Sequence, residues 1–270
     1  MTAAAFAVAA EPTTVDAFLG GRLQAVQPAA GHHRAGLEAV FLGAALGPEF
    51  AGMVVDLGAG AGVAGLAVAA RCAKASVVLV ERDPTAVACA RAALALAANR
   101  AFADRVSVIA ADVAWPEARR EAAGLKRASA EAVVMNPPFN PSDGDPSPRS
   151  ALAAAHVLGE GGLAPWLRTA ASVLRPGGRL AVVFRADGLD PVLAACRDRF
   201  GALDVLPIAP HAGAPARRVL VGGVKGSRAP LRLLSPLVLH ATDRDGWTAE
   251  AAAVLSGARS LGEVHPSWPR

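Results

Sequence analysis

An amide, two prolines and an aromatic residue follow one another at Asn136-Pro137-Pro138-Phe139, directly after the apolar run 132–135. The prolines fix φ and donate no backbone hydrogen bond, so they stiffen the start of the loop and leave carbonyl groups available as acceptors. If the apolar run is a buried strand, the amide and the aromatic ring stand at its carboxyl end, where open α/β sheets bind ligands. The motif is short enough to arise by chance, so its meaning depends on whether a cofactor site precedes it.

A glycine-rich segment, Asp56-Leu57-Gly58-Ala59-Gly60-Ala61-Gly62, follows the apolar residues 53–55 and precedes a helical pattern. Glycine lets the backbone turn tightly and approach a bound cofactor without a Cβ in the way. Gly60, Gly62 and Gly65 also fit the dinucleotide fingerprint, in which a pyrophosphate lies at the helix N-terminus. The glycine loop alone therefore predicts a cofactor site without identifying the cofactor.

Two further acids follow predicted strands, Glu81 at the end of the second and Asp112 after the third. An acid at the end of the second strand suits ribose hydroxyls in either type of cofactor. Each acid could singly be a loop residue or a helix cap. Because Asp56, Glu81 and Asp112 all fall at strand carboxyl ends, the sequence favours a binding site.

Short apolar runs alternate with longer helical patterns along the chain, which predicts an α/β fold with a mostly parallel sheet and helices on both faces. Asp83 and Pro84 suit the N-cap and the first position of a helix. Residues 203–206 and 218–224 are expected to close the sheet as an antiparallel pair at its edge. The predicted strands are 53–55, 76–80, 106–109, 132–135, 180–184 and 231–240. The predicted helices are 35–46, a segment reaching residue 73, 84–99, segments reaching residue 174, 190–200 and 248–255.

The chain has 270 residues, of which 53% are hydrophobic, enough for a substantial core. Much of that fraction is alanine, and no uncharged apolar run reaches about 18 residues, the length that a spanning helix needs. The sequence therefore predicts no membrane partner. The first ten residues are apolar but lack a basic n-region, so residues 1–15 are expected to be a disordered leader, with a secretory signal as the alternative.

The three cysteines, Cys72, Cys89 and Cys196, are widely spaced and form no CxxC pair. This argues against a disulfide framework and a zinc site, and it favours buried thiols in a reducing compartment, here the cytoplasm. The one histidine cluster, His32-His33, lacks metal-ligand spacing. No metal is expected.

The net charge of +4 is unevenly distributed. Residues 205–270 contain seven arginines and one lysine against two aspartates and two glutamates, so this region accounts for the whole surplus. A polyanionic partner is one interpretation, and a merely solvated basic face is the other.

The spacing of Asp56 and the glycines, with acids after the next two strands, resembles the cofactor site of class I S-adenosylmethionine-dependent methyltransferases. In that class the acid after the third strand accepts a hydrogen bond from the adenine amino group. A dinucleotide enzyme is the alternative. The resemblance implies S-adenosylmethionine as the cofactor, bound by Asp56, Gly58, Gly60, Gly62, Glu81 and Asp112.

Within this class, Asn-Pro-Pro-Phe/Tyr after the fourth strand resembles the loop of enzymes that methylate planar, conjugated nitrogens. Their targets are adenine N6, guanine N2 and the glutamine side-chain amide. Such a nitrogen is a poor nucleophile because its lone pair is delocalised. The resemblance implies Asn136, Pro137 and Phe139 as catalytic residues: the Asn136 side-chain oxygen and the Pro137 carbonyl would accept the two N–H bonds and direct the lone pair toward the methyl group. Phe139 would stack on the flat target, or alternatively fill the loop as a core aromatic.

Further segments, spread from about residue 16 to residue 256, resemble the bacterial tRNA1(Val) adenine-N6-methyltransferase family, whose members methylate an anticodon-loop adenine. That resemblance implies a Rossmann-like seven-stranded sheet with an antiparallel edge strand and an RNA substrate, tRNA foremost. The oligomeric state stays open. The segments are Phe18-Leu19-Gly20-Gly21-Arg22, Gln27-Pro28, 31–40, 218–221, Lys225-Gly226 and 236–240.

Several positions depart from that family. It usually has Gly-Tyr-Arg at residues 31–34, an aspartate at Glu38, Cys and Thr at Ala59 and Ala61, and often tyrosine at Phe139. These differences leave the cofactor chemistry intact and leave the exact RNA open. Arg34 and Glu38 are one helical turn apart and could pair to cap the cofactor pocket, which makes Arg34 a candidate cofactor-binding residue; a surface helical pair is the alternative.

The sequence therefore predicts one methyltransferase domain over residues 16–256. It would consist of an N-terminal cap segment (16–50), a Rossmann-like core (51–226) and a C-terminal extension (227–256), followed by a tail (257–270). The leading hypothesis is methyl transfer to adenine N6 in tRNA. The alternatives are a protein-glutamine N5-methyltransferase, an rRNA guanine-N2-methyltransferase and a non-catalytic cofactor- or RNA-binding module.

Overall fold

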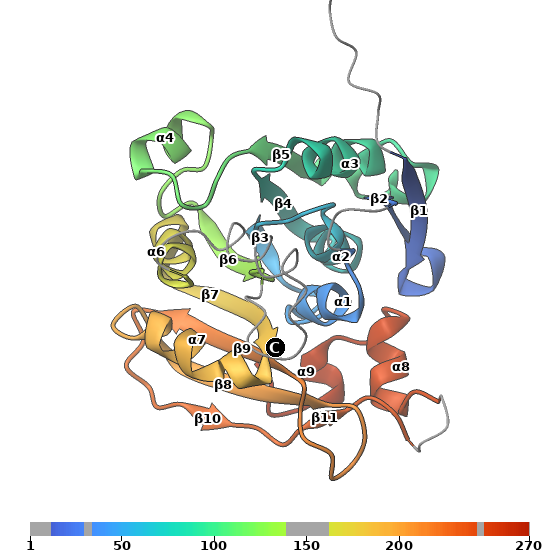
Figure 1. The fold of residues 1–270 in the computed structure, drawn as a ribbon, viewed down its shortest axis with the longest axis vertical. Coiled ribbons are helices and arrows are strands. Elements are labelled where there is room, and N and C mark those ends of the chain that lie inside the picture. Colours follow the sequence, from blue (N-terminus) through green and yellow to red (C-terminus); the bar gives the residue numbers. More distant parts are fainter. Residues whose placement is uncertain (1–11, 30–33, 139–161, 242–245, 270) are drawn as a thin grey trace, which may run out of the picture.

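A computed structural model describes residues 12–29, 34–138, 162–241 and 246–269 (Figure 1). In this part of the chain, one large sheet runs through the middle of the molecule in the order β10-β8-β9-β7-β6-β3-β4-β5, and β11 also pairs with β8. Neighbouring strands are parallel, except that β9 is antiparallel to both β7 and β8. The predicted α/β fold with a mostly parallel, Rossmann-like sheet is confirmed.

The strands of this sheet are β3 (Ala51–Leu57), β4 (Lys74–Glu81), β5 (Val106–Ala110), β6 (Ala130–Met135), β7 (Leu174–Arg185), β8 (Phe200–Ala209), β9 (Arg218–Lys225), β10 (Arg232–Leu233) and β11 (Leu237–Val238). The antiparallel strand expected at the sheet edge is β9, and it lies between β7 and β8, with β10 and β11 further out on β8. The stretch 231–240 forms two short strands rather than one, because both pair with different parts of β8.

Helices cover both faces of the sheet (Figure 1). One face packs against α1, α2, α3, α8 and α9, and the other against α6 and α7. Strand residues alternate between the two cores: Val54 faces the first and Val55 the second, and both are buried because helices cover both sides. The helices are α1 (Leu37–Gly43), α2 (Val63–Arg71), α3 (Pro84–Leu94), α4 (Glu117–Ala122), α6 (Ala164–Val173), α7 (Leu189–Cys196), α8 (Ala249–Leu255) and α9 (Leu261–Val264). Short 3-10 helices are η1 (Leu19–Gly21), η2 (Ala97–Asn99), η3 (Ala103–Arg105) and η4 (Ala186–Gly188).

The two ends of the described chain both pack onto the first face. The antiparallel hairpin β1 (Thr13–Phe18) and β2 (Leu23–Pro28) lies beside α3, and β1 begins inside the segment expected as a leader. After residue 256, where a tail was expected, α9 forms and Trp268 is 3% exposed. The Trp268 Nε1 donates to the carbonyl of Ala45 at 2.9 Å, so this segment is part of the core.

Local signals explain several element ends. Asp83 is the N-cap of α3, its Oδ1 accepting from the amide of Ala86 at 2.9 Å, and Pro84 is the first helical residue, as predicted. Helix α3 stops at Leu94 instead of residue 99, and η2 follows. Strand β7 begins at Leu174, ahead of residue 180, where the predicted strand starts. Within the described ranges, no helix is long and apolar enough to cross a membrane.

Candidate cofactor and acceptor site

The strand order reverses between β3 and β6, and the two predicted loops start at that point. From β3 the chain builds β4 and β5 on one side, and then returns to β6 on the other. Leu57 at the end of β3 pairs with Met135 at the end of β6, so Gly58 and Asn136 leave adjacent parallel strands about 4.8 Å apart. Open α/β sheets bind ligands at such a reversal, outside the strand carboxyl ends. The predicted cofactor loop and acceptor loop therefore face the same crevice.

Asp56 holds the start of helix α2 close to the end of β3, and so fixes the glycine loop between them. Its side chain is 2% exposed, and its Oδ2 accepts from the backbone amide of Gly65, inside α2, at 2.8 Å. Burial raises the pKa of Asp56 to about 7, the Gly65 hydrogen bond opposes this rise, and the nearby charge of Glu81 adds to it. The carboxyl group thus fixes the turn from β3 into α2 and titrates near neutral pH.

The loop glycines have different reasons to be glycine. All three of Gly58, Gly60 and Gly62 have positive φ (68°, 55° and 88°). A Cβ on Gly58 would collide with the Trp166 ring, and one on Gly62 would lie 2.7 Å from Leu79. A Cβ on Gly60 would meet nothing within 4 Å. Gly58 and Gly62 are therefore required by packing, whereas Gly60 borders open space that a cofactor can occupy.

Glu81 ties the ends of β3 and β4 together. Its Oε2 accepts from the amide of Gly60 at 2.8 Å, and its Oε1 accepts from the amides of Arg82 and Asp83 at 2.7 and 2.8 Å. Because β4 lies next to β3, this half-buried carboxylate stands beside the glycine loop, as the sequence predicted.

Asp112 follows β5, the next strand outward. Its Oδ1 accepts from the amide of Ala114 at 2.8 Å, and its Oδ2 pairs with the Arg82 guanidinium at 3.2 Å. The three acids thus lie at the carboxyl ends of three adjacent parallel strands, Asp56 and Glu81 within β3 and β4 and Asp112 just after β5, and each one accepts from a nearby backbone amide.

Asn136 differs from these acids because one of its polar atoms has no partner. Its Oδ1 is buried and accepts no hydrogen bond from any described residue. Pro137 is buried and Pro138 is half-buried, so the prolines hold the start of the loop against the protein. Phe139, the remaining predicted catalytic residue, and the rest of the loop through Pro148 lie outside the described residues, as do His32-His33.

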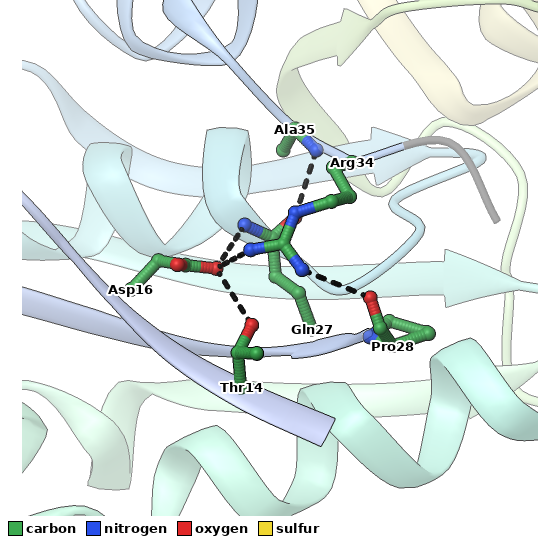
Figure 2. Close-up of polar contacts among 6 residues, drawn as sticks. All are labelled: Thr14, Asp16, Gln27, Pro28, Arg34 and Ala35. Carbon is green, nitrogen blue, oxygen red and sulfur yellow. Dashed lines mark hydrogen bonds and ion pairs between the residues drawn. The ribbon is translucent and has the colours of Figure 1, made fainter. Parts of the chain in front are cut away.

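The expected Arg34–Glu38 pair is wrong. Arg34 instead donates to Asp16 Oδ2 at 2.6 Å and to the Pro28 carbonyl at 3.1 Å, which ties it to the β1–β2 hairpin (Figure 2). Glu38 pairs with Arg218 of β9 at 3.0 Å. One helical turn brings two side chains close only if both lie within the helix, and Arg34 precedes α1, which begins at Leu37.

Gln27 entered the sequence-based prediction only within a family resemblance, and its place in this network around Asp16 was not predicted. It is 2% exposed, its Nε2 donates to Asp16 at 2.8 Å, and its Oε1 accepts from the amide of Ala35 at 2.8 Å (Figure 2). It therefore fixes the entry into α1, the helix that packs over the carboxyl ends of β6 and β7. A buried glutamine gives no sequence signal that distinguishes it from a surface one.

A cavity of about 370 Å³ flanks the loop after Asp112, between α4 and α6. The Arg119 guanidinium lies 3.7 Å from the ring centroid of Trp115, one of the lining residues. Thr169 Oγ1 donates to the Val113 carbonyl at 2.7 Å and so anchors the same loop.

The described residues contain no group of three His, Cys, Asp or Glu side chains placed to hold a metal ion. All three cysteines are buried, as predicted. Burial raises the pKa of Cys72 to about 11 and that of Cys196 to about 12, so both stay neutral thiols at physiological pH.

The fold, the strand reversal and the glycine loop with its three acids define a Rossmann-like methyltransferase. The chain belongs to the methyltransferase small domain family, whose model matches residues 36–206. The predicted class of enzyme is confirmed, and S-adenosylmethionine is the cofactor of that class.

Three relatives refine this assignment. A predicted O-methyltransferase of Agrobacterium tumefaciens, a solved structure, is 36% identical with a TM-score of 0.72, and the match covers 82% of this chain and 97% of that one. The tRNA1(Val) (adenine(37)-N6)-methyltransferase of Porphyromonas gingivalis is 33% identical over 58% of this chain and 60% of its own length. The release factor glutamine methyltransferase of Mycolicibacterium smegmatis is 36% identical over 48% of this chain and 44% of its own length. The chain thus spans less than two thirds of the curated relatives that it matches.

Proposed function

We propose that this protein transfers the methyl group of S-adenosylmethionine to an exocyclic amine, adenine N6 in tRNA first of all. The observation that carries the proposal is the Asn136 Oδ1 atom, buried and unpartnered among the described residues, beside the loop that would hold the methyl donor. A buried acceptor without a partner costs about 1–3 kcal/mol. That cost is explained if the substrate supplies the missing N–H.

An exocyclic amine brings two N–H bonds. Asn136 Oδ1 accepts one and the Pro137 carbonyl accepts the other, which points the nitrogen lone pair away from the target plane and toward the methyl group. Asn136 is neutral, so it orients the amine and does not carry off its proton. Phe139 stacks on the flat target. Most of the rate enhancement comes from this orientation, because the reacting atoms are held in line.

The cofactor binds across the ends of β3, β4 and β5. The glycine loop with Gly58, Gly60 and Gly62 leaves room for it at Gly60, and Asp56 keeps that loop in shape. Glu81 accepts hydrogen bonds from the ribose hydroxyls and gives up some of its hydrogen bonds to backbone amides. Asp112 accepts from the adenine amino group.

Two observations favour RNA as the acceptor. The curated relative with the longer match is a tRNA adenine-N6-methyltransferase, and the surplus of arginine after residue 205 suits a polyanion. The target adenine must be unstacked, which costs least in a loop or a single strand. The buried thiols fit a reducing compartment, and we place the reaction in the cytoplasm.

The similarity to a release factor glutamine methyltransferase supports a second candidate, because a glutamine amide also presents two N–H bonds on a planar nitrogen. Guanine N2 in rRNA is the third acceptor with this chemistry. All three fit the Asn136 and Pro137 acceptors equally, so only the product distinguishes them.

The test uses three separate reactions, each with the purified protein and labelled S-adenosylmethionine. The acceptor is tRNA, rRNA or release factor, each taken from a strain that lacks the gene. Nucleoside and peptide mass spectrometry then identify the product. We expect N6-methyladenosine in tRNA. If the product is N2-methylguanosine in rRNA or methylglutamine in the release factor, that group is the acceptor instead of adenine N6. If none of the three substrates is labelled, the proposal is overturned.

A further inference from the structure

Three aromatic rings lie together at the carboxyl ends of the parallel strands, the same end of the sheet from which the acceptor loop leaves. His211 follows the end of β8, His240 follows β11, and Trp247 follows four residues outside the described part. The His240 ring stacks on Trp247, with centroids 4.6 Å apart and planes 22° apart, and its centroid lies 5.4 Å from that of His211.

The backbone holds these rings in place. The Leu237–Val238 strand runs parallel to β8, and the amide of His240 donates to the Pro210 carbonyl at 2.9 Å. His240 and Trp247 face each other in an antiparallel bridge, and the amide of Thr248 donates to the Leu239 carbonyl at 2.8 Å. The stack is therefore fixed to the sheet, yet Trp247 remains 41% exposed, one of few large apolar side chains at the described surface.

The stack lies within reach of the acceptor site. Because β8 and β11 are parallel to β6, His211 and His240 leave the sheet at the edge where Asn136 leaves it. From β6 to β11 there are four strand spacings, across β7, β9 and β8, which places the ends of β6 and β11 roughly 19 Å apart. That is the span of a few nucleotides of single strand.

Arginines occupy the edge between the two positions. Arg185 ends β7 and pairs with Asp187, and Arg218 begins β9 and pairs with Glu38. Arg217, one residue before β9, is exposed, and its side chain makes no ion pair or hydrogen bond with the described residues. Its backbone is nevertheless fixed, since its amide donates to the Ile208 carbonyl and its carbonyl accepts from Ala186. This one guanidinium is free to meet an anion.

We propose that His240, Trp247 and Arg217 form a surface, the Trp247 surface, that binds an unpaired stretch of RNA next to the target nucleotide. A base stacks on the exposed face of Trp247, which His240 supports from behind, and Arg217 binds a phosphate between that base and the target. The proposal rests on the proposed function, since it assigns the part of the RNA that the acceptor loop does not hold.

The chemistry of the surface favours single-stranded RNA over other polyanions. Base stacking on an aromatic side chain contributes regardless of base identity, and it requires bases that are not already stacked in a duplex. A phosphate contact by a guanidinium positions the strand without reading its sequence. Trp247 offers a ring for a base, and Arg217 offers a cation for the phosphate backbone. Both lie at the end of the sheet that carries the acceptor loop, so together they suit an RNA loop whose bases are unstacked.

Variants of Trp247 test the stacking. The probe is bulk tRNA from a strain that lacks the gene, and the readouts are the tRNA dissociation constant, KM and kcat. Trp247→Ala should weaken tRNA binding and raise KM by roughly 10- to 100-fold, the value of one base–aromatic stack, with kcat nearly unchanged. Trp247→Phe keeps a π face and should restore most of the affinity, whereas Trp247→Leu keeps apolar bulk and should not. A merely structural role would instead be rescued equally by leucine and phenylalanine.

A matched pair of arginine variants tests the phosphate contact. Arg217→Gln should weaken tRNA binding and lower the slope of log affinity against log salt by about one. Arg228→Gln removes the same charge from an exposed residue near the start of β8, at the opposite edge of the sheet, and should leave that slope unchanged. Equal effects of the two variants would mean that only overall charge matters, and would overturn the role of Arg217.

Binding and methylation separate the two proposals. If the wild-type protein binds tRNA and Trp247→Ala binds it equally well, the Trp247 surface is overturned, whether or not the tRNA is methylated. If the wild type does not bind tRNA, the surface is overturned as well. If tRNA is bound through Trp247 but receives no methyl group, the proposed function fails and the surface stands.

Discussion

The two halves of the crevice are built in opposite ways. On the cofactor side, the carboxylates of Asp56, Glu81 and Asp112 each accept hydrogen bonds from nearby backbone amides. On the acceptor side, Asn136 keeps a buried oxygen without a partner among the described residues, Trp247 is 41% exposed, and the Arg217 side chain makes no ion pair or hydrogen bond with those residues. One half is satisfied within the protein, and the other is left for a ligand to complete.

This difference agrees with what we propose that each half binds. A cofactor of constant shape is bound best by a loop that is already in its final conformation, because little ordering then opposes binding. An acceptor nitrogen has to be held only while it reacts. The groups that bind it lower the barrier most if they are in place and have no other hydrogen-bonding partner before the acceptor arrives. Substitutions on the cofactor side should therefore change stability and cofactor affinity together, whereas those on the acceptor side should change acceptor binding or catalysis and leave stability and cofactor affinity nearly unchanged.

The largest effect is expected for Asn136→Ala. Removing one positioned hydrogen-bonding group from a reacting centre costs roughly 100- to 1,000-fold in rate, so methyl transfer should fall by that factor. The S-adenosylmethionine dissociation constant, measured by calorimetry, should stay within about twofold, because Asn136 lies on the acceptor side of the crevice. The melting temperature should change little, since Oδ1, one of the atoms removed, accepts no hydrogen bond from the described residues. An Asn136→Ala enzyme with full activity would remove the basis of the proposed function.

Within the cofactor half, Gly58→Ala and Gly60→Ala form a matched pair, because both glycines have positive φ. At Gly58 the added Cβ meets the Trp166 ring, so the free energy of unfolding should fall by roughly 2–5 kcal/mol, from backbone strain plus overpacking. At Gly60 the Cβ enters open space, so only the backbone strain of about 1–2 kcal/mol remains. Gly60→Ala should instead weaken S-adenosylmethionine binding by roughly tenfold or more.

Thermal unfolding and calorimetry of both variants check this pair. If Gly60→Ala binds the cofactor as the wild type does, the open space beside it is not the cofactor pocket. Loss of stability without loss of affinity at both positions would assign the loop a purely structural role.

Asp56→Asn should change how stability depends on pH. The folded-state pKa of Asp56 is raised from 3.8 to about 7, so the folded protein holds a proton that the unfolded chain has released. The stabilisation is complete below about pH 4 and is lost as the pH rises through about 7. Asparagine can still accept from Gly65 and does not titrate. The variant should therefore gain stability relative to the wild type between pH 4 and pH 7, and keep a constant difference above that range.

Unfolding by denaturant at several pH values measures this difference. A difference that stays constant from pH 4 to pH 8 would show that Asp56 titrates in its ordinary range in the folded protein.

The cofactor half could be predicted from sequence because its signals are local. Glycines, an acid after each strand and the Asp83-Pro84 helix start are determined by backbone conformation within a few residues, and the structure has them at those places. The strands next to them are continuous apolar runs, which is typical of strands buried on both faces.

The contacts between distant segments could not be predicted in that way. Arg34 pairs with Asp16 and Glu38 with Arg218, across 18 and 180 residues of sequence, and one-turn spacing suggested a different pair. Trp268 and the β1–β2 hairpin pack on the core although their flanking sequence looked like a tail and a leader. The position of β9 between β7 and β8 depends on strand order, and strand order has no local signal.

The smallest effects are expected for Arg34→Gln and Asp16→Asn. Comparing these two variants tests whether Arg34 contacts the cofactor or only holds the hairpin in place. Their ion pair is partly exposed, 39% and 31%, so each variant should lose less than about 1 kcal/mol of stability. Asparagine at residue 16 keeps an acceptor for the buried Gln27, which isolates the loss of charge. If Arg34 acts only by fastening the hairpin to the start of α1, the two variants should lower S-adenosylmethionine affinity alike and by no more than about fivefold. A loss confined to Arg34→Gln would instead support the direct contact with the cofactor that the sequence predicted.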